Sequence, residues 1–185
     1  MAQQLIGFIG AGNMANSLAG GMIAKGIRPA RIWMSDPSQD RLNEVAQLHR
    51  VHVSRDNLDV ARRVDVLVLA VKPQIAPEVF SGLAAASVPR LLSIAAGITT
   101  AAMEAALPEG TVVVRSMPNT PALVGQGMAA IAPGVHAGDD DLVWATSILS
   151  AVGRVVTVAE SDLDAVTGVS GSGPAYVFQF IEAMR

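Results

Sequence analysis

The chain has no cysteine, only two lysines and no long uninterrupted apolar run. Without cysteine it can form neither disulfides nor thiolate metal sites, and this absence fits a reducing cytoplasm. No stretch reaches the ~18 consecutive apolar residues of a membrane-spanning helix, so we expect no membrane partner. Because no basic segment precedes the first apolar run, we also expect no signal peptide and a cytoplasmic location.

Basic residues are not in excess, which argues against a nucleic-acid partner. The 13 lysines and arginines are scattered along the chain, and the formal net charge is −3. Nucleic-acid-binding domains instead carry a concentrated basic patch. Apolar residues make up 51% of the 185 residues and charged residues 16%, which is typical of a folded α/β domain with one full core.

Familiar catalytic motifs are also missing. His49, His52 and His136 lack metal-ligand spacing, and no Ser-His-Asp set, GxSxG turn or Walker lysine is present. We therefore assign no metal site and no catalytic side chain. The lack of an evident general base favours hydride transfer to an already protonated electrophile, because there the protein need only position and orient its ligands.

The strongest positive signal is a glycine turn near the N-terminus. An apolar run over residues 5–9 ends in Gly10-x-Gly12-x-x-Ala15, and a segment with helical spacing follows. This order of strand, turn and helix is typical of dinucleotide-binding folds, in which the helix N-terminus holds the pyrophosphate. Gly10 would permit the turn, Gly12 the close approach of the phosphates, and Ala15 the tight packing of helix on strand.

Beyond this turn, short apolar runs alternate with amphipathic segments, which predicts a Rossmann-type doubly wound α/β fold with a mainly parallel sheet. We expect strands near residues 4–10, 31–35, 51–53, 65–71, 90–95, 111–115, 126–132 and 153–158. Helices are expected near 12–25, 38–49, 56–62, 74–85 and 99–106, with another starting at Asp139-Asp140-Asp141. We interpret the three acids as residues that complement a helix N-terminus, with a cation site as the alternative.

Ser35 and Asp36 fall where the second strand of a dinucleotide-binding fold ends beside the adenosine ribose. A serine there can hydrogen-bond a 2′-phosphate, whereas an acidic residue takes the ribose hydroxyls and disfavours that phosphate. The pair leaves NADPH and NADH both open, and a plain turn-forming role for Asp36 is the alternative. If Asp36 repels the 2′-phosphate, its replacement by alanine shifts the preference toward NADPH.

Further loops are expected at the same edge of the sheet, where ligands of such folds bind. Lys72, in Ala70-Val-Lys-Pro-Gln74, either faces a phosphate or ribose or is solvated. Ser93-Ile-Ala-Ala-Gly-Ile98 places small residues where a flat ring can approach the backbone. Asn119, between Pro118 and Pro121, has an amide that either faces a nicotinamide or substrate or only closes a turn.

A second glycine cluster, TGVSGSGPAY over residues 167–176, is interpreted as a turn. Its N–H groups and the hydroxyls of Ser170 and Ser172 would suit an anion such as a carboxylate, and a linker between domains is the alternative. Pro174 suits the first turn of the apolar helix that follows over residues 175–184. A helix this apolar usually packs on another element.

In this order, the motifs at residues 7–15, 70–74, 93–98, 115–122 and 165–176 closely resemble the Δ1-pyrroline-5-carboxylate reductase family. The resemblance spans essentially the whole chain. It implies reduction of the cyclic imine 1-pyrroline-5-carboxylate to L-proline by NADPH, or by NADH, as the last step of proline biosynthesis. Hydride would pass from the nicotinamide to the imine carbon.

The resemblance also implies which residues form the site. The cofactor-binding residues it implies are Gly10, Gly12, Asn13, Met14, Ala15, Ser35, Asp36, Ala70, Val71, Lys72, Pro73, Ala95, Ala96, Gly97 and Asn119. The substrate-side residues it implies are Ser170, Gly171, Ser172, Gly173 and Pro174.

Members of this family continue through a helical domain that dimerises by interlocking. The resemblance therefore implies a dinucleotide-binding domain over residues 1–160 and only the start of an all-α dimerisation domain over 161–185. We expect a homodimer or larger homo-oligomer when that domain is present, and a 185-residue polypeptide that binds cofactor better than it turns over substrate.

Two alternative functions stay open at this point. One is a β-hydroxyacid or prephenate-type dehydrogenase, whose reaction needs a proton acceptor such as lysine or histidine after the sheet. The other is a non-catalytic nucleotide-binding module, which would bind cofactor without turning over a substrate.

Overall fold

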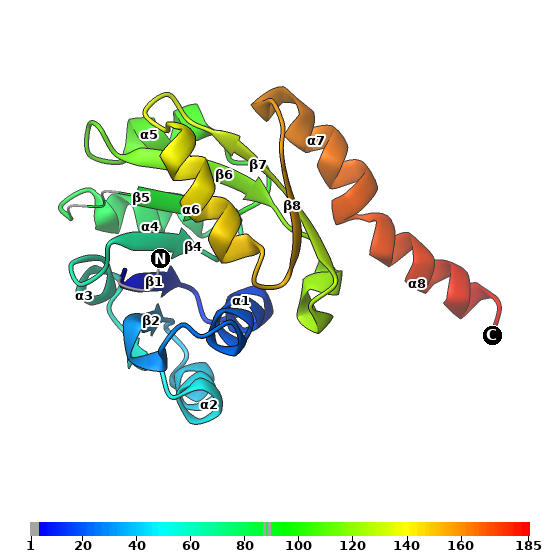
Figure 1. Ribbon diagram of the computed structural model, residues 1–185, viewed down its shortest axis with the longest axis horizontal. Helices are drawn as coiled ribbons and strands as arrows, with labels where there is room; N and C mark the ends of the chain where they lie inside the picture. Colours follow the sequence, from blue (N-terminus) through cyan, green and yellow to red (C-terminus); the bar gives the residue numbers. More distant parts are fainter. Residues whose placement is uncertain (1–3, 87, 89) are drawn as a thin grey trace.

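The alternating pattern folds into a sheet with helices on both faces (Figure 1). The computed structural model describes residues 4–86, 88 and 90–185, and within them the sheet has eight strands. The strands are β1 (Ile6–Ile9), β2 (Ile32–Ser35), β3 (His52–Ser54), β4 (Val66–Leu69), β5 (Arg90–Ser93), β6 (Val112–Met117), β7 (Gly127–Pro133) and β8 (Gly153–Thr157).

The strand order is β3-β2-β1-β4-β5-β6-β7-β8. Neighbouring strands are parallel except for β6 and β7, which are antiparallel. The chain moves outward from β1 in one direction to β3 and then in the other direction from β4. This reversal beside β1 is the switch point at which doubly wound sheets bind their ligands. The Rossmann-type fold predicted from the sequence is confirmed.

Eight helices and four short helical turns lie in the described part of the chain. The helices are α1 (Asn13–Ala24), α2 (Gln39–His49), α3 (Asn57–Ala61), α4 (Ala76–Leu83), α5 (Thr100–Ala106), α6 (Asp139–Leu149), α7 (Leu163–Val166) and α8 (Gly173–Ala183). The short turns are the 3-10 segments η1 (Pro29–Arg31), η2 (Thr120–Val124) and η3 (Glu160–Asp162) and the π-helical segment η4 (Thr167–Gly171).

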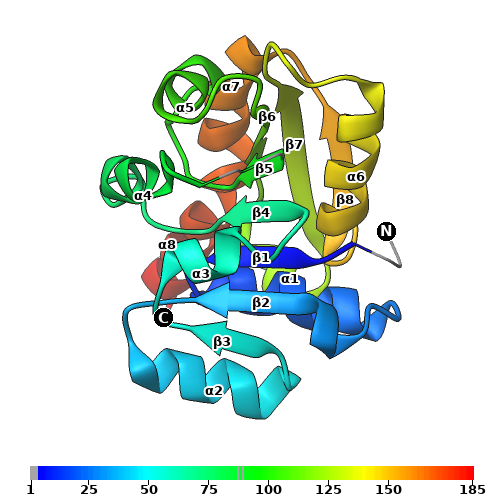
Figure 2. The same ribbon diagram turned by 90° about the vertical axis from the view of Figure 1, so that its left-hand side faces the viewer.

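The core lies in two layers, one on each face of the sheet (Figure 2). Helices α1, α2 and α6 pack on one face, and α3, α4 and α5 pack on the other. Successive residues of each strand point to opposite faces. In β1, for example, Phe8 enters the first layer and Ile9 the second. Burial on both faces explains why the central strands are apolar without alternation.

The start of α6 confirms the interpretation of Asp139, Asp140 and Asp141 as helix-start residues. All three lie in its first turn, and the Asp141 carboxylate accepts hydrogen bonds from the Gly138 N–H and the Trp144 Nε1–H, each at 3.0 Å. In the part of the chain that the structure describes, no group of three or more metal-ligating side chains is placed to hold an ion.

The helix expected from Pro174 is confirmed as α8, but residues 167–171 differ from the expected turn, because they are helical. α7, η4 and α8 follow one another directly, and the Ser172 N–H donates to the Thr167 carbonyl at 2.8 Å. That N–H is therefore used within the helix. A Cβ on Gly171 would lie 2.5 Å from Met117 Cε, so this glycine permits close packing on the end of β6. The glycines serve a wide helical turn here.

Helix α8 leaves the body of the molecule and projects from it (Figure 1). Every residue from Ala175 to Arg185 is exposed. The preceding helix α7 is anchored by Leu163, which is fully buried against Ala130 and Ala132 of β7. Among the described residues, no helix is both long and apolar enough to cross a membrane.

Candidate dinucleotide-binding site

The glycine turn lies where the carboxyl ends of β1, β2 and β4 meet. The Gly10 N–H donates to the Ser35 carbonyl at 2.8 Å, and the Ala70 N–H donates to the Ile9 carbonyl at 2.8 Å. The three strand ends are thus joined by main-chain bonds at the switch point of the sheet.

Gly10 and Gly12 differ in how much the structure constrains them. Gly10 has φ of +95°, and a Cβ at this position would lie 2.6 Å from the Ala70 carbonyl oxygen. Gly12 has φ of −76° and is the residue before α1, and a Cβ there would meet no atom within 4 Å. A side chain on Gly12 would instead fill the space in front of the helix.

The N-terminus of α1 suits an anion. No side chain caps it and no acidic residue lies in its first turn, so its N–H groups keep their partial positive charge. Asn13 is exposed and Met14 half-buried, whereas Ala15 is buried and lets the helix pack closely on the sheet. A pyrophosphate fits this arrangement of donors and free space.

The side chains of Ser35 and Asp36 have different surroundings in the structure. The Ser35 side chain is fully buried, and its hydroxyl donates to Asn57 Oδ1 at 2.7 Å. It therefore lies inside the fold, where a phosphate arriving from solvent does not meet it. The Asp36 carboxylate accepts from the Ala11 N–H at 3.0 Å and from the Ser38 N–H at 2.9 Å. These contacts favour a role for Asp36 in shaping the turn.

The loops after β4 and β5 lie at the same sheet edge. Lys72 is exposed, and Ala70, Val71 and Pro73 are half-buried. After β5, Ala95 is buried, Ala96 is half-buried and Gly97 is exposed. Backbone and small side chains thus border the edge. Their assignment to the cofactor stays a prediction.

Asn119 connects the two groups of residues that the sequence assigned to cofactor and substrate. Its Nδ2 donates to Ser170 Oγ at 3.1 Å, and its Oδ1 accepts from the Met128 N–H at 2.9 Å. The side chain therefore joins the β6–η2 loop to β7 and to η4. These side-chain contacts do not close a local turn before Pro121, which was the alternative raised from the sequence.

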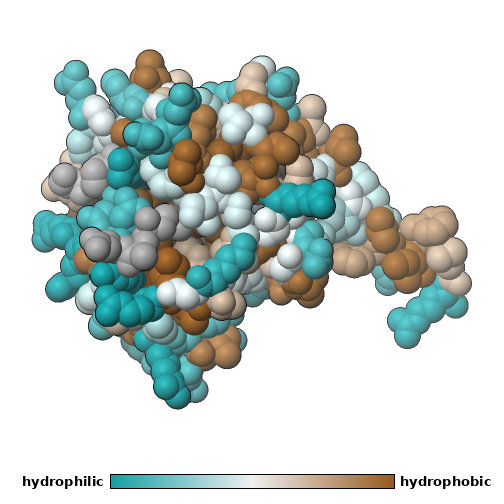
Figure 3. All heavy atoms as spheres, in the orientation of Figure 1, coloured by the Kyte–Doolittle hydropathy of each residue, from teal (hydrophilic) through white to brown (hydrophobic). Residues whose placement is uncertain are grey.

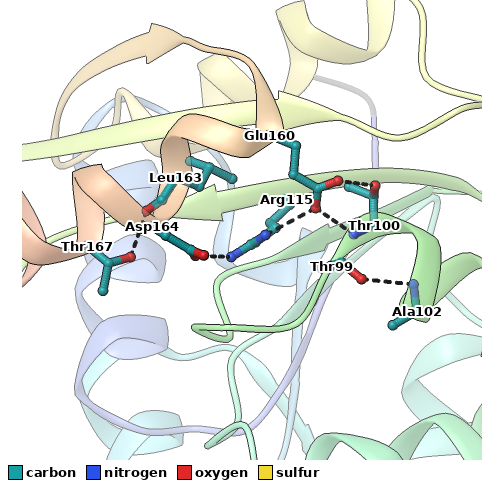
Figure 4. Close-up of polar contacts among 8 residues, drawn as sticks. All are labelled: Thr99, Thr100, Ala102, Arg115, Glu160, Leu163, Asp164 and Thr167. Atoms are coloured by element: carbon teal, nitrogen blue, oxygen red, sulfur yellow. Dashed lines mark hydrogen bonds and ion pairs between the residues drawn. The ribbon is translucent and has the colours of Figure 1, made fainter.

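The sequence did not reveal a charge cluster that forms around a buried arginine beside η3 and α7 (Figure 4). Arg115, in β6, is 7% exposed and lies 3.1 Å from Glu160 and 3.3 Å from Asp164. Glu160 also accepts from the N–H and the hydroxyl of Thr100, each at 2.7 Å. An arginine after three valines in a buried strand was the available signal, because such a charge needs a partner.

These contacts govern the ionisation of Glu160. Burial raises the pKa of its carboxyl, but the hydrogen bonds from Thr100 and the nearby Arg115 guanidinium lower it more, so the net pKa lies below its usual value. Glu160 therefore stays charged and holds the start of α7 against α5 and β6.

His49 lies away from these loops. Its Nε2 contacts Asn16 Oδ1 and ties α2 to α1. Burial lowers the pKa of its imidazole, and the contact with Asn16 opposes this effect. His49 is thus a half-buried residue that packs α2 on α1.

Two family models match the chain. Residues 5–97 match "NADP oxidoreductase coenzyme F420-dependent", and residues 160–185 match "Pyrroline-5-carboxylate reductase dimerisation". A pyrroline-5-carboxylate reductase of Methanosarcina acetivorans is 48% identical over 187 aligned residues, which cover 100% of this chain and 69% of that protein. The chain belongs to the pyrroline-5-carboxylate reductase family.

Solved structures agree with this membership. The Plasmodium falciparum pyrroline carboxylate reductase with NADP bound superposes with a TM-score of 0.85 at 31% identity, covering 99% of this chain and 68% of that one. A prephenate dehydrogenase of Aquifex aeolicus has a TM-score of 0.77 at 16% identity, covering 99% of this chain and 70% of that one. The second likeness reflects the shared fold alone.

Proposed function

We propose that this reductase-family chain reduces 1-pyrroline-5-carboxylate to L-proline with NADPH, and with NADH as a second cofactor. The observation that carries the proposal is 48% identity to a pyrroline-5-carboxylate reductase along the full chain, and the uncapped N-terminus of α1 at the switch point supports it. A bound reduced nicotinamide supplies the hydride that converts the imine to the amine.

The chain's own residues bind and orient. The uncapped N-terminus of α1 and the open space at Gly12 hold the pyrophosphate. The loops at residues 70–73 and 95–97 and the side chain of Asn119 border the nicotinamide half. Residues 170–174 lie next to Asn119 through the Ser170 contact and border the substrate side. In this role the protein contributes proximity and orientation.

The decisive experiment follows loss of NADPH absorbance when pyrroline-5-carboxylate is added to the purified chain. Substrate-dependent oxidation would support the proposal. Cofactor binding without any oxidation would favour a non-catalytic nucleotide-binding module. Reduction of NADP⁺ with a β-hydroxyacid in place of the imine would favour the dehydrogenase alternative.

The family model at residues 160–185 supports a homo-oligomer whose contacts include α8. We place the boundary between the dinucleotide-binding part and the dimerisation part near residue 160, after β8, and a cytoplasmic location fits a biosynthetic reductase.

A further inference from the structure

The Asp36 carboxylate is enclosed at the point where β2 ends. The residue is only 5% exposed, and each of its oxygens accepts a main-chain N–H from a different segment. Oδ2 accepts from Ala11 in the glycine turn at 3.0 Å, and Oδ1 accepts from Ser38 before α2 at 2.9 Å. The side chain therefore joins the glycine turn to the start of α2.

The bond to Ala11 holds the middle of the turn, between the Gly10 N–H, which donates to the Ser35 carbonyl, and the Gly12 carbonyl, which accepts from Asn16 in α1. Ala11 lies between Gly10, whose φ is +95°, and Gly12, beside which no atom lies within 4 Å of a Cβ position. Two consecutive glycine-flanked peptides are intrinsically mobile. A hydrogen bond to an ionised acceptor is stronger than one between neutral groups. The carboxylate thus restricts the turn to one shape.

We propose that Asp36 is a positioning residue, which holds the glycine turn in its pyrophosphate-binding shape through the Ala11 N–H. It supports NADPH and NADH alike, because both carry the same pyrophosphate. This inference deepens the proposed function and rests on it. It replaces the expectation that Asp36 selects between the cofactors by repelling the 2′-phosphate.

The two roles lead to opposite results for Asp36→Asn. The variant keeps the size of the side chain, but its amide oxygen can accept from only one of the two N–H groups. If Asp36 positions the turn, the Kd for both cofactors rises by about tenfold, as expected for loss of a hydrogen bond to a charged acceptor. If Asp36 repels the 2′-phosphate, the Kd for NADPH falls while that for NADH does not.

Asp40→Asn is the matched control. Asp40 is exposed in the first turn of α2, so this variant removes the same charge from the same region without removing a bond to the glycine turn. Its Kd values for NADPH and NADH, measured by nicotinamide fluorescence, should stay within about twofold of the unmodified chain. A general effect of charge would instead change the Kd values of both variants alike, and this result would overturn the proposal.

Two further measurements distinguish a positioning role of Asp36 from a general loss of structure. In kinetics with pyrroline-5-carboxylate, Asp36→Asn should raise the KM for each cofactor while kcat at saturating cofactor stays within about twofold. In the cofactor-free protein, the Ala11 amide should exchange with solvent at least about tenfold faster in Asp36→Asn, with the Phe8 amide of β1 unchanged.

Equal loss of affinity for both cofactors together with faster Ala11 exchange would support the proposal. Improved NADPH binding alone, or unchanged Ala11 exchange, would overturn it. If the unmodified chain bound neither cofactor, the proposed function would fail, and the role of Asp36 in the turn would be decided by the Ala11 exchange rate alone.

Discussion

Gly10 and Gly12 are two residues apart, yet a methyl group would act differently at each. At Gly10 it would strain the backbone and collide with the Ala70 carbonyl, which belongs to the neighbouring strand end. At Gly12 it would touch no protein atom and would enter the space available to a ligand. The fold thus constrains Gly10 but leaves room for a side chain at Gly12.

Gly10→Ala should therefore lower both stability and cofactor affinity, whereas Gly12→Ala should lower affinity alone. We expect Gly10→Ala to reduce the free energy of unfolding by about 2 kcal/mol or more, because a positive φ is unfavourable for alanine and backbone atoms cannot move aside. Gly12→Ala should change it by less than about 0.5 kcal/mol. Denaturant unfolding and NADPH titration of both variants test this.

Two results with these variants would contradict the expectation. If Gly12→Ala bound NADPH as tightly as the unmodified chain, the space in front of α1 would not be the pyrophosphate site. If Gly10→Ala were fully stable, the close approach to Ala70 would not be a constraint on the fold.

The segments η3, α7 and η4 are held to the sheet by charge as well as by Leu163. Arg115 contacts Glu160 and Asp164, and Glu160 in turn accepts from Thr100 at the start of α5. The cluster thus links β6, α5 and the segment that leads to α8 (Figure 4). Asn119 adds a second link through Ser170 in η4.

Glu160 should make stability depend on acid pH. Its folded pKa lies below its usual value, so its stabilising contribution is complete above the unfolded pKa of about 4.5 and is lost as pH falls through the folded pKa. Glu160→Gln should remove this part of the pH dependence, since it cannot ionise. Unfolding midpoints measured from pH 7 to pH 3 test the difference between the two proteins.

Asp162→Asn serves as the control for this experiment, because Asp162 is an exposed acid in the same short turn. Its pH profile should follow that of the unmodified chain. An identical profile for Glu160→Gln would show that the cluster does not stabilise the fold through this carboxylate.

The surface of the whole molecule is uneven, because its apolar side chains gather on the projecting arm formed by α8. Tyr176, Val177, Phe178, Phe180, Ile181 and Met184 are each more than half exposed. The arm appears in Figure 3 as a run of brown and tan spheres beyond the body of the molecule. A contiguous apolar surface of this kind marks an interaction site.

We expect α8 to drive self-association, in line with the dimerisation model that matches residues 160–185. Phe178→Asp combined with Ile181→Asp should convert associated chains to monomers, because buried charges would oppose the contact. Size-exclusion chromatography with light scattering gives the mass of each form.

Leu48→Asp provides the control, since Leu48 is equally exposed (63%) but lies on α2. This variant should keep the mass of the unmodified chain. An unmodified chain that is monomeric at all concentrations, or a double variant with unchanged mass, would contradict a role for α8 in association.

Local patterns in the sequence were enough to predict the strands, the helices before residue 150, and the glycine turn. These features depend on spacing of apolar residues and on glycine and proline, which act within a few residues of their own position. The same local reasoning predicted the helix that begins at Pro174 but was wrong for residues 167–171. The glycines there predict a turn, but the segment is the helical turn η4, in which Gly171 packs closely on Met117.

The sequence by itself determined the fold class, the family and the position of the glycine turn between β1 and α1. Only the tertiary structure showed the distant partners of Ser35, Asp36 and Asn119. These partners are Asn57, Ala11 and Ser170, which lie 22, 25 and 51 residues away in the chain, so no local pattern could reveal them. A side chain that can bind a ligand can equally bind a backbone group, and only the folded chain shows which of the two lies within reach.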